Sequence, residues 1–292
     1  MAESLVKKDY CVTKIAFVTG ASRGIGRATA LAFAREGYDV AISARSIDDG
    51  SRHKHEVVAV DGTVLAGSLR ATAAAIEALG RKVWLVPLDL LDETSVQQAV
   101  AQVSKECGRI DVLVNNAIYQ GSDLNSAFLD LSAETLDRVY RGYVLGPVAL
   151  TQGIAKLMVA QGAGVSINGS SGAGEHNPPV PADKGGWGYA YGAGKAAVSR
   201  LAGIINVELG TKGLRAYTVN PGVVTTEALK ATIGDQGIAA LGGMAAPPEV
   251  PAEAILWLAH ADHAGRYIKR TVDTQKLALD QYLVDNWRKR SK

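Results

Sequence analysis

The sequence predicts an α/β fold, a single doubly wound domain whose seven-stranded, mostly parallel sheet carries helices on both faces. Three observations lead to this prediction. Short apolar segments alternate with longer segments of helical periodicity along most of the 292 residues. The apolar segments do not alternate with polar residues, which is typical of parallel strands buried on both faces. The first of them leads directly into a glycine-rich turn that opens a helix, at residues 19–26.

The strand and helix predictions follow the chain in order. Strands are expected at residues 14–19, 39–44, 83–88, 111–114, 164–169, 214–219 and 270–273. Helices are expected at residues 20–36, 68–79, 93–106, 133–159, 189–209 and 252–260, with a bend at Gly146-Pro147 in the longest. We predict one domain over residues 1–292, with a polar insertion at 46–67, substrate loops at 172–188 and 225–248, and a C-terminal tail at 275–292.

Composition narrows the possible partners. The formal net charge of +2 gives no electrostatic reason to expect nucleic acid, and the basic C-terminal end is interpreted as a solvated tail. No apolar segment is predicted to span a bilayer, and the charged first residues do not resemble a secretion signal. The two cysteines and five histidines form no metal or redox motif. We therefore expect a cytoplasmic protein that binds neither nucleic acid, membrane nor metal.

The glycine turn is suited to hold a phosphate. Gly20 allows a sharp turn, whereas Gly24 and Gly26 let the backbone approach a ligand and let the helix pack closely on the sheet. The first turn of the following helix offers free N–H groups and the positive end of a dipole to a pyrophosphate. A tight structural turn is the alternative interpretation.

Polar side chains follow most of the predicted strands, at the edge where an open α/β sheet binds its ligands. They are Thr19, Arg45, Asp89, Asn115, Asn116, Ser171 and Asn220. Tyr191 and Lys195 lie four residues apart on the next helix and so share a face. A nearby ammonium and the positive ring of an oxidised nicotinamide both lower a phenol's pKa, which makes tyrosine a usable acid or base. The alternative is an exposed helix pair, but Ser171 could hold a substrate oxygen beside the phenol.

Together these motifs resemble the short-chain dehydrogenase/reductase family, in its core-length Rossmann-fold branch, from about residue 14 to residue 273. The motifs are Thr19-Gly20-x-x-x-Gly24-x-Gly26, Asp89, Asn115-Asn116-Ala117, Ser171, Tyr191-x-x-x-Lys195 and Pro221-Gly222-x-x-x-Thr226. The resemblance implies that Tyr191 is the catalytic acid/base, that Lys195 lowers its pKa and holds the nicotinamide ribose, and that Ser171 orients the substrate. Register with the family's serine pair favours Ser171 over Ser170.

The resemblance also implies where the cofactor binds. The glycine turn would hold the pyrophosphate, Asp89 would meet the adenine, Asn115 would lie under the adenosine ribose, and residues 221–226 would flank the nicotinamide. The complete predicted set is Gly20, Ser22, Arg23, Gly24, Ile25, Gly26, Arg45, Asp89, Leu90, Asn116, Ala117, Tyr191, Lys195, Pro221, Gly222, Val224 and Thr226.

Cofactor preference is predicted from charge. An acidic residue at the end of the second strand would bond the ribose 2′-hydroxyl of NAD, but this strand ends Ser43-Ala44-Arg45. Arg23 inside the glycine turn adds a second guanidinium, so we expect NADP(H) in preference to NAD(H). The alternative is that both are ordinary surface arginines. His53, Lys54 and His55 are interpreted as a solvated loop, with a contribution to the phosphate site as the alternative.

The sequence departs from the family pattern at several positions. Tyr143 stands where the family has a catalytic asparagine, so the proton relay is altered or absent. Ile118 replaces the glycine that usually follows Asn-Asn-Ala, the segment before Tyr191 is long, and the usual acidic-glycine-glycine end of the last strand is missing. We expect Ile118, Tyr119, Tyr143 and Trp187 to line the substrate pocket, which favours a hydrophobic ketone or alcohol.

These observations predict an NADP(H)-dependent oxidoreductase that moves hydride between a nicotinamide and a carbonyl or alcohol substrate. The family implies a homodimer or homotetramer. A catalytically weak dinucleotide-binding sensor or scaffold is the alternative, motivated by Tyr143 and Ile118. A sugar-nucleotide epimerase or dehydratase is disfavoured by the glycine spacing.

Overall fold

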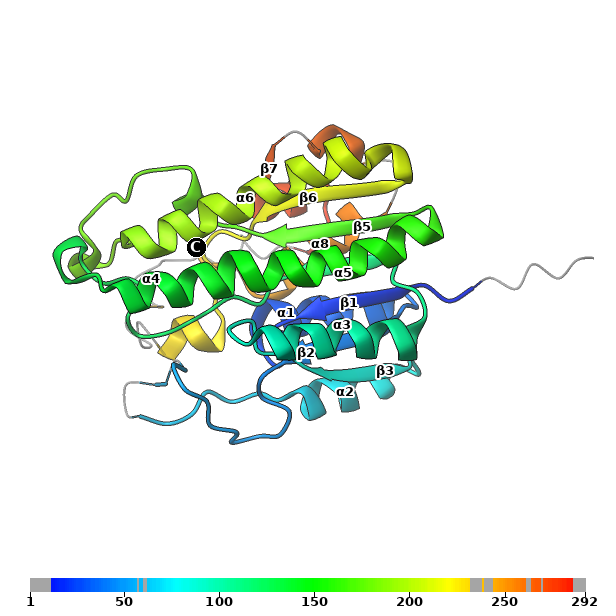
Figure 1. Ribbon diagram of the computed structural model, residues 1–292, viewed down its shortest axis with the longest axis horizontal. Coiled ribbons are helices and arrows are strands. Elements are labelled where there is room, and N and C mark those ends of the chain that lie inside the picture. The colour runs from blue at the N-terminus through cyan, green and yellow to red at the C-terminus, as the bar shows by residue number, and fades with distance from the viewer. Residues whose placement is uncertain are drawn as a thin grey trace, which may run out of the picture.

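Seven strands form one parallel sheet in the computed structural model, in the order β3-β2-β1-β4-β5-β6-β7 (Figure 1). The structure describes residues 12–56, 58–59, 62–231, 238, 244–260, 264–268 and 270–285. Every pairing between neighbouring strands is parallel, which confirms the predicted fold class. The strands are β1 (Ile15–Thr19), β2 (Asp39–Ala44), β3 (Val83–Pro87), β4 (Val112–Asn115), β5 (Gly164–Gly169), β6 (Leu214–Asn220) and β7 (Thr271–Asp273).

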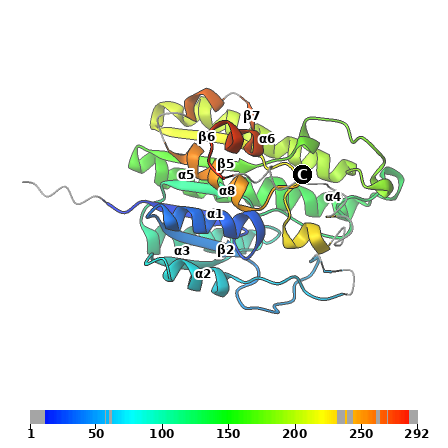
Figure 2. The ribbon, with the colours of Figure 1, turned by 180° about the vertical axis from the view of Figure 1, so that it is seen from behind.

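Helices cover both faces of this sheet. Figure 1 shows α3 (Glu93–Cys107), α5 (Gly146–Gln161) and α6 (Tyr189–Leu209) in front of it. The opposite face carries α1 (Gly24–Arg35), α2 (Leu69–Glu77) and α8 (Glu249–Ala259), as Figure 2 shows. Further helices are α4 (Ala133–Tyr140), which leads toward α5, and α9 (Thr274–Asp280), which packs on α8; residues 227–231 are also helical.

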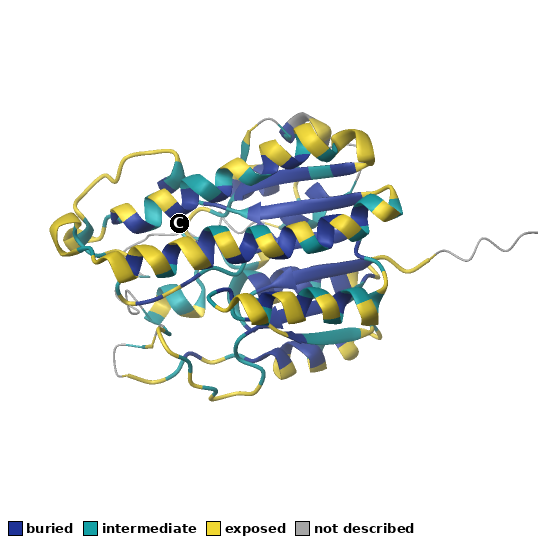
Figure 3. Cartoon of the chain, viewed as in Figure 1, coloured by how far each residue is buried: buried dark blue, intermediate teal, exposed yellow. Residues whose placement is uncertain are grey.

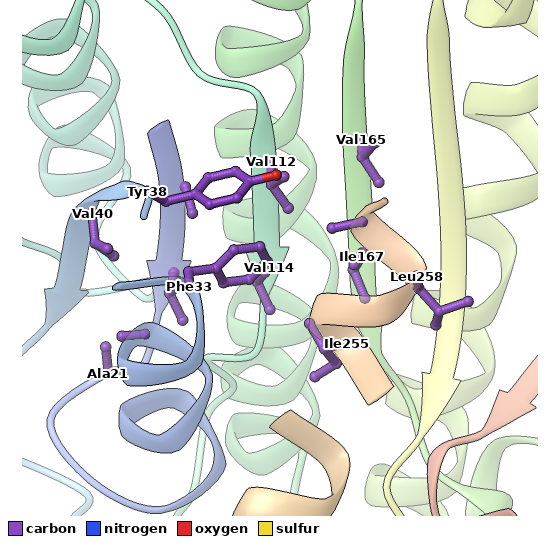
Figure 4. Close-up of a cluster of buried hydrophobic side chains, with 14 of the residues drawn as sticks. Ala21, Phe33, Tyr38, Val40, Val112, Val114, Val165, Ile167, Ile255 and Leu258 are labelled. Atoms are coloured by element: carbon purple, nitrogen blue, oxygen red, sulfur yellow. The ribbon is translucent and has the colours of Figure 1, made fainter. Parts of the chain in front are cut away.

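Alternating strand residues feed two hydrophobic cores. Ala16 and Val18 of β1 face the α1–α8 side, where Phe33 and Leu258 are buried with them (Figure 4). Phe17 points to the other side, into a cluster with α3, α5 and α6. Because both faces are covered, the strands between the edge strands β3 and β7 are buried along most of their length (Figure 3). This explains why their sequences are continuously apolar.

The strand order reverses direction at β1. The chain winds outward from β1 through β2 to β3 and then returns to place β4 on the other side of β1. At such a switch point the crossovers diverge and leave a crevice beyond the carboxyl ends of the strands. In Figure 1 the strand arrowheads point toward the end of the molecule where residues 46–67 and 172–188 project. The fold therefore places a ligand site between the ends of β1 and β4.

The long helix predicted at residues 133–159 differs from expectation in its middle. A π-helical segment, Arg141–Leu145, joins α4 to α5 just before the predicted bend. Pro147 lies in the first turn of α5, where a missing N–H costs little. The run Ala133–Gln161 is also long and apolar enough to cross a membrane, so our prediction that no segment qualifies was wrong. Leu150 and Ile154 of this run are buried in the sheet core, which accounts for its apolar character.

The prediction of a C-terminal tail over residues 275–292 is wrong for residues 275–280, which are helical. Thr274–Asp280 form α9, whose N-terminus is capped by the Asp273 carboxylate, 2.9 Å from Lys276 N. Leu277 and Ala278 are buried. Apolar residues at helical spacing after β7 were the signal for this helix. Residues 286–292 of the predicted tail lie outside the described residues.

The burial of Phe33 gives a test of the core. We expect Phe33→Ala to lower the free energy of unfolding by about 3–5 kcal/mol, since it removes a fully buried ring from the first core. Val207→Ala, at a side chain that is 84% exposed, should change it by less than about 0.5 kcal/mol. Urea unfolding followed by circular dichroism measures both, and equal losses in the two variants would contradict the described core.

Candidate active site

The glycine turn between β1 and α1 is built so that side chains are excluded from it. Gly20 and Gly24 have φ angles of +68° and +54°. A Cβ added to Gly26 would lie 2.2 Å from the Gly20 carbonyl oxygen, so only glycine lets α1 begin this close to β1. Arg23 at the start of α1 makes no side-chain capping bond and the first turn holds no acidic residue. The turn is therefore a cradle in which N–H groups at a helix N-terminus can receive an anion.

The end of β4 is tied to this turn through Thr19. Its Oγ1 accepts hydrogen bonds from Asn116 N at 3.0 Å and Ala117 N at 2.9 Å. The Asn116 amide donates in return to the Thr19 carbonyl oxygen at 2.9 Å. Of the predicted cofactor residues, Asn116 and Ala117 thus lie directly against Gly20. Ser22 is buried within the turn, and Ile25 packs on the α1–α8 core.

The Asn115 side chain is hydrogen-bonded to neighbouring elements of the protein. Its Nδ2 donates to Thr151 Oγ1 at 2.8 Å and to Asn168 Oδ1 at 2.9 Å, and the residue is buried. These bonds join β4 to β5 and α5. The Asn115 side chain thus fixes the strand ends, and the position of this residue under the adenosine ribose stays a prediction. Asn168, a polar residue inside an apolar strand, was the overlooked signal.

Ser171, Tyr191 and Lys195 come together beyond the carboxyl end of β5. Ser171 follows that strand; its Oγ accepts from Ala173 N at 3.3 Å, and it lies close enough to the Tyr191 phenol to act on that group's pKa. Lys195, one helical turn after Tyr191, donates from Nζ to the Gly169 carbonyl oxygen at 2.7 Å. Its Nζ lies 5.9 Å from the Tyr191 ring centroid. Ser170 instead bonds the Lys195 carbonyl oxygen and Ser199 within the protein, which leaves Ser171 beside the phenol.

Burial dominates the electrostatics of this trio. It raises the pKa of Tyr191, and the Ser171 side chain only partly opposes that rise. It lowers the pKa of Lys195 from 10.5 to about 7. The reason is that removal from water disfavours the charged form of both groups. In the protein alone the pKa of Tyr191 is thus raised, and its lowering by Lys195 and a bound nicotinamide stays a prediction.

Tyr143 fills the position of the family asparagine with a buried ring. It lies in the π-helical segment, perpendicular to the Tyr191 ring at 6.3 Å between centroids, and Lys195 Nζ lies 5.5 Å from its centroid. Its hydroxyl is buried without a hydrogen-bond partner. A Cβ at Gly194 would lie 2.7 Å from the Tyr143 ring, so that glycine makes room for the phenol. Single π-helical turns occur often at functional sites.

The predicted substrate residues are placed in three different surroundings. Ile118 and Tyr143 line a small, mainly apolar cavity of about 30 Å³ at the end of β4. The Tyr119 hydroxyl donates to Asp123 at 2.5 Å and accepts from Arg138, so it serves the structure of its own loop. Trp187 packs beside Gly192 in the first turn of α6, near Tyr191. The structure thus brings Tyr143, from the π-helical segment, and Trp187, from the loop before α6, close to the first turn of α6.

The segment after β6 is held by a residue that the sequence analysis missed. Gln275 Nε2 donates to the carbonyl oxygens of Pro221 at 3.0 Å and Val223 at 2.9 Å. It lies so close that a Cβ at Gly222 would be 2.6 Å from it. The side chain of Thr226 reaches the glycine turn, 3.1 Å from the Cβ position of Gly24. Val224 forms a bridge to Ala246, while residues 232–237 and 239–243 of the predicted substrate loop lie outside the described residues.

Two arginines stand at the outer end of the crevice. Arg23 Nη2 donates to the Gly67 carbonyl oxygen at 3.2 Å, while its Nε is buried without a partner. Arg45, directly after β2, donates from Nη1 to the Lys54 carbonyl oxygen at 2.9 Å. Asp89 holds the turn after β3 by accepting from Leu91 N at 3.0 Å, and Leu90 is buried against Gly146. No acidic side chain ends β2, since its last residues are Ser43 and Ala44.

A parallel sheet with a glycine cradle at its switch point defines a dinucleotide-binding Rossmann protein. Residues 14–237 match the family model for short chain dehydrogenases. The L-rhamnose 1-dehydrogenase (NAD(P)(+)) of a Sphingomonas species is 34% identical over 224 residues, covering 76% of this chain and 77% of that protein. The cyclohexanol dehydrogenase of a Rhodococcus species is 31% identical over 229 residues, covering 78% and 80%.

Solved structures agree with this assignment. L-sorbose reductase from Gluconobacter frateurii, complexed with NADPH and L-sorbose, matches with a TM-score of 0.71 at 25% identity, over 89% of this chain and 94% of that chain. Acetoin dehydrogenase from Enterobacter cloacae matches with a TM-score of 0.69 at 27% identity, over 91% and 97%. The chain therefore belongs to the short-chain dehydrogenase/reductase family. It is an oxidoreductase of the kind that acts on alcohol and carbonyl groups.

The buried Lys195 predicts how stability depends on pH. Its folded pKa of about 7 lies below the unfolded 10.5, so between these values the unfolded chain binds a proton that the folded chain does not. The free energy of unfolding should therefore gain roughly 1 kcal/mol per pH unit from this group between about pH 7.5 and 9, and nothing below its folded pKa.

Lys195→Met should abolish that gain, and Lys156→Met, at an exposed lysine of α5, should preserve it. Denaturant unfolding of the nucleotide-free protein at several pH values measures the difference. If the free energy of unfolding changed with pH in the same way in wild type and in Lys195→Met, the Lys195 ammonium would not be desolvated in the folded protein.

Proposed function

We propose that this protein is an NADP(H)-dependent oxidoreductase that transfers hydride between the nicotinamide and a fairly hydrophobic carbonyl or alcohol substrate. The observation that carries the proposal is the Ser171–Tyr191–Lys195 trio beside the β1–β4 switch point. The dinucleotide fits the residues present, because Gly26 lets α1 begin close to the end of β1 and the Arg23 Nε is buried without a partner.

Each member of the trio has a distinct task in this proposal. Ser171 Oγ donates a hydrogen bond to the substrate oxygen, and the Tyr191 hydroxyl gives that oxygen a proton during reduction or removes one during oxidation. Lys195 uses one of its three donors on the Gly169 carbonyl oxygen. Its other donors are available for the nicotinamide ribose and for the phenolate. The bound nicotinamide supplies or accepts the hydride.

Tyr143 changes how Lys195 exchanges protons. An asparagine would offer an amide carbonyl to a water molecule, whereas the Tyr143 ring presents its face to the ammonium at 5.5 Å. Lys195 is buried, and among the described contacts its Nζ has a single hydrogen-bond acceptor. Reprotonation of Tyr191 must therefore pass through the ribose hydroxyls or the substrate side. We propose slower turnover than the family pattern would give.

The cofactor preference and the substrate class rest on the surroundings of the trio. Arg23 and Arg45 stand where the 2′-phosphate of NADP(H) would lie, and β2 ends without the acidic residue that a 2′-hydroxyl would require. The apolar and aromatic side chains of Ile118, Tyr143 and Trp187 favour a hydrophobic substrate. The cyclohexanol dehydrogenase among the relatives is named for an apolar alcohol.

Removal of the Tyr191 hydroxyl tests the catalytic assignment. Tyr191→Phe should lose about 10²–10⁴-fold in turnover, the range for a lost acid/base group, with NADPH affinity within about twofold of wild type. Assays of NADPH oxidation with a panel of ketones and aldehydes measure the turnover, and a fluorescence titration measures the NADPH affinity. Equal turnover in the two proteins would refute the assignment. Tight NADPH binding by a wild type that reduces no carbonyl would favour the dinucleotide-sensor alternative.

A charge change at Arg45 tests the cofactor preference. Arg45→Gln keeps a donor for the Lys54 carbonyl oxygen but removes the charge, so NADPH should bind about tenfold more weakly and NADH equally well. Arg27→Gln, at an exposed position on α1, is the matched control and should leave both affinities unchanged. An equal loss for NADH and NADPH would place Arg45 outside the 2′-phosphate site.

A further inference from the structure

We infer that His53, on the 46–67 insertion, is a third ligand of the 2′-phosphate of NADP(H) and takes up a proton when that phosphate binds. The inference rests on the proposed NADP(H) preference and extends it, because it gives the insertion a role in cofactor selection. It also favours the interpretation of this histidine that the sequence analysis ranked second.

The insertion is anchored against the glycine turn. Leu69 N donates to the Ser46 carbonyl oxygen at 3.0 Å and closes the base of the loop. The Thr72 hydroxyl donates to the Ala21 carbonyl oxygen at 2.8 Å. Gly67 approaches so closely that a Cβ there would lie 2.5 Å from the Ser22 carbonyl oxygen. In Figure 1 the loop projects from the same end of the sheet as the strand termini. It is therefore part of the crevice wall.

Two hydrogen bonds turn the middle of the loop back toward β2. Arg45 donates to the Lys54 carbonyl oxygen at 2.9 Å, and His53 N donates to Glu56 Oε2 at 3.0 Å. This places the His53 imidazole with its Nε2 buried and without a hydrogen-bond partner. Arg23 Nε is unpartnered in the same way. A buried polar nitrogen without a partner is rare in native proteins, and an anion that accepted a hydrogen bond from either nitrogen would satisfy it.

The charges around His53 come from four parts of the chain. Burial is the largest influence and lowers its pKa, and Arg45 and Arg23 lower it further. Glu56 on the same loop and Asp89 after β3 act in the opposite direction. Glu56 is also paired with Arg52 at 2.8 Å, which weakens its hold on the imidazole. The protein alone therefore favours the neutral imidazole.

A phosphate reverses this balance. A phosphate monoester carries nearly two negative charges near neutral pH and offers strong acceptor oxygens. Placed between Arg23, Arg45 and His53, it favours the imidazolium, in which both ring nitrogens donate. His53 Nε2 then donates to a phosphate oxygen, and one proton comes from solvent. NADH has no 2′-phosphate, so its binding leaves His53 neutral.

Titrations of NADPH and NADH between pH 6 and 8.5 test the inference. The wild type should bind NADPH about tenfold more tightly at pH 6 than at pH 8.5, beyond any change seen in His53→Gln. At pH 6, His53→Gln should bind NADPH about tenfold more weakly than wild type and NADH equally well. His53→Lys, which keeps a positive charge across this range, should restore tight NADPH binding without the pH dependence. The 2′-phosphate of NADPH also changes its own protonation in this pH range. That contribution to the affinity is the same for every variant, so it cancels when the variants are compared.

Binding calorimetry in two buffers that differ in ionisation enthalpy measures the number of protons taken up when the cofactor binds. NADPH binding to the wild type should take up more protons than binding to His53→Gln, and NADH should show no such difference. Lys54→Gln, which removes a neighbouring charge of the same loop, is the control and should behave as wild type.

The outcomes separate this inference from the proposed function. A wild type that binds NADPH no more tightly than NADH would overturn the cofactor preference itself. A wild type that prefers NADPH, with His53→Gln indistinguishable from it, would overturn the role of His53 alone. Equal effects of His53→Gln and Lys54→Gln would show that loop charge in general attracts NADPH, and would also overturn that role.

Discussion

The hydrogen bond from the buried Lys195 ammonium to the Gly169 carbonyl oxygen, 2.7 Å long, is the contact on which the catalytic geometry depends. It fixes the first turns of α6 to the end of β5. Ser171 follows β5 and Tyr191 begins α6, so their approach follows from this bond together with those from Ser170 to the Lys195 carbonyl oxygen and Ser199. A lysine on the surface could not hold the strand end and the helix together in this way, because exposed ion pairs and hydrogen bonds contribute little to stability. Burial also removes the Lys195 amine from water, which lowers its pKa to about 7.

The Tyr143 ring increases the desolvation of Lys195 and makes the site more rigid. It occupies space that Gly194 leaves free, and it stands perpendicular to Tyr191. An aromatic face attracts a cation, which partly offsets the missing water around Lys195. An aromatic face accepts no proton, however. The substitution therefore stabilises the position of the ammonium while it removes a route by which the ammonium could exchange protons with solvent.

Most of the fold followed from the sequence because it rests on local patterns. Continuous apolar strands and the glycine turn predicted the sheet, and Tyr191 with Lys195 followed from helical spacing. Asn115 and Gln275 could not be placed in this way. Their roles depend on partners 36 or more residues away, at Thr151, Asn168, Pro221 and Val223. Sequence spacing likewise reports the charge near Tyr191 but not the loss of water that raises its pKa in the protein alone.

Desolvation links the two ends of the crevice. Burial is the largest cause of the lowered pKa at Arg23, at His53 and at Lys195. Each of these groups therefore gains most from a negative charge brought into the same dry environment. At the outer end the proposed 2′-phosphate would supply that charge, and at the proposed catalytic end a Tyr191 phenolate would supply it. Under these proposals, desolvation would strengthen both the binding of the phosphate and the attraction between Lys195 and the phenolate.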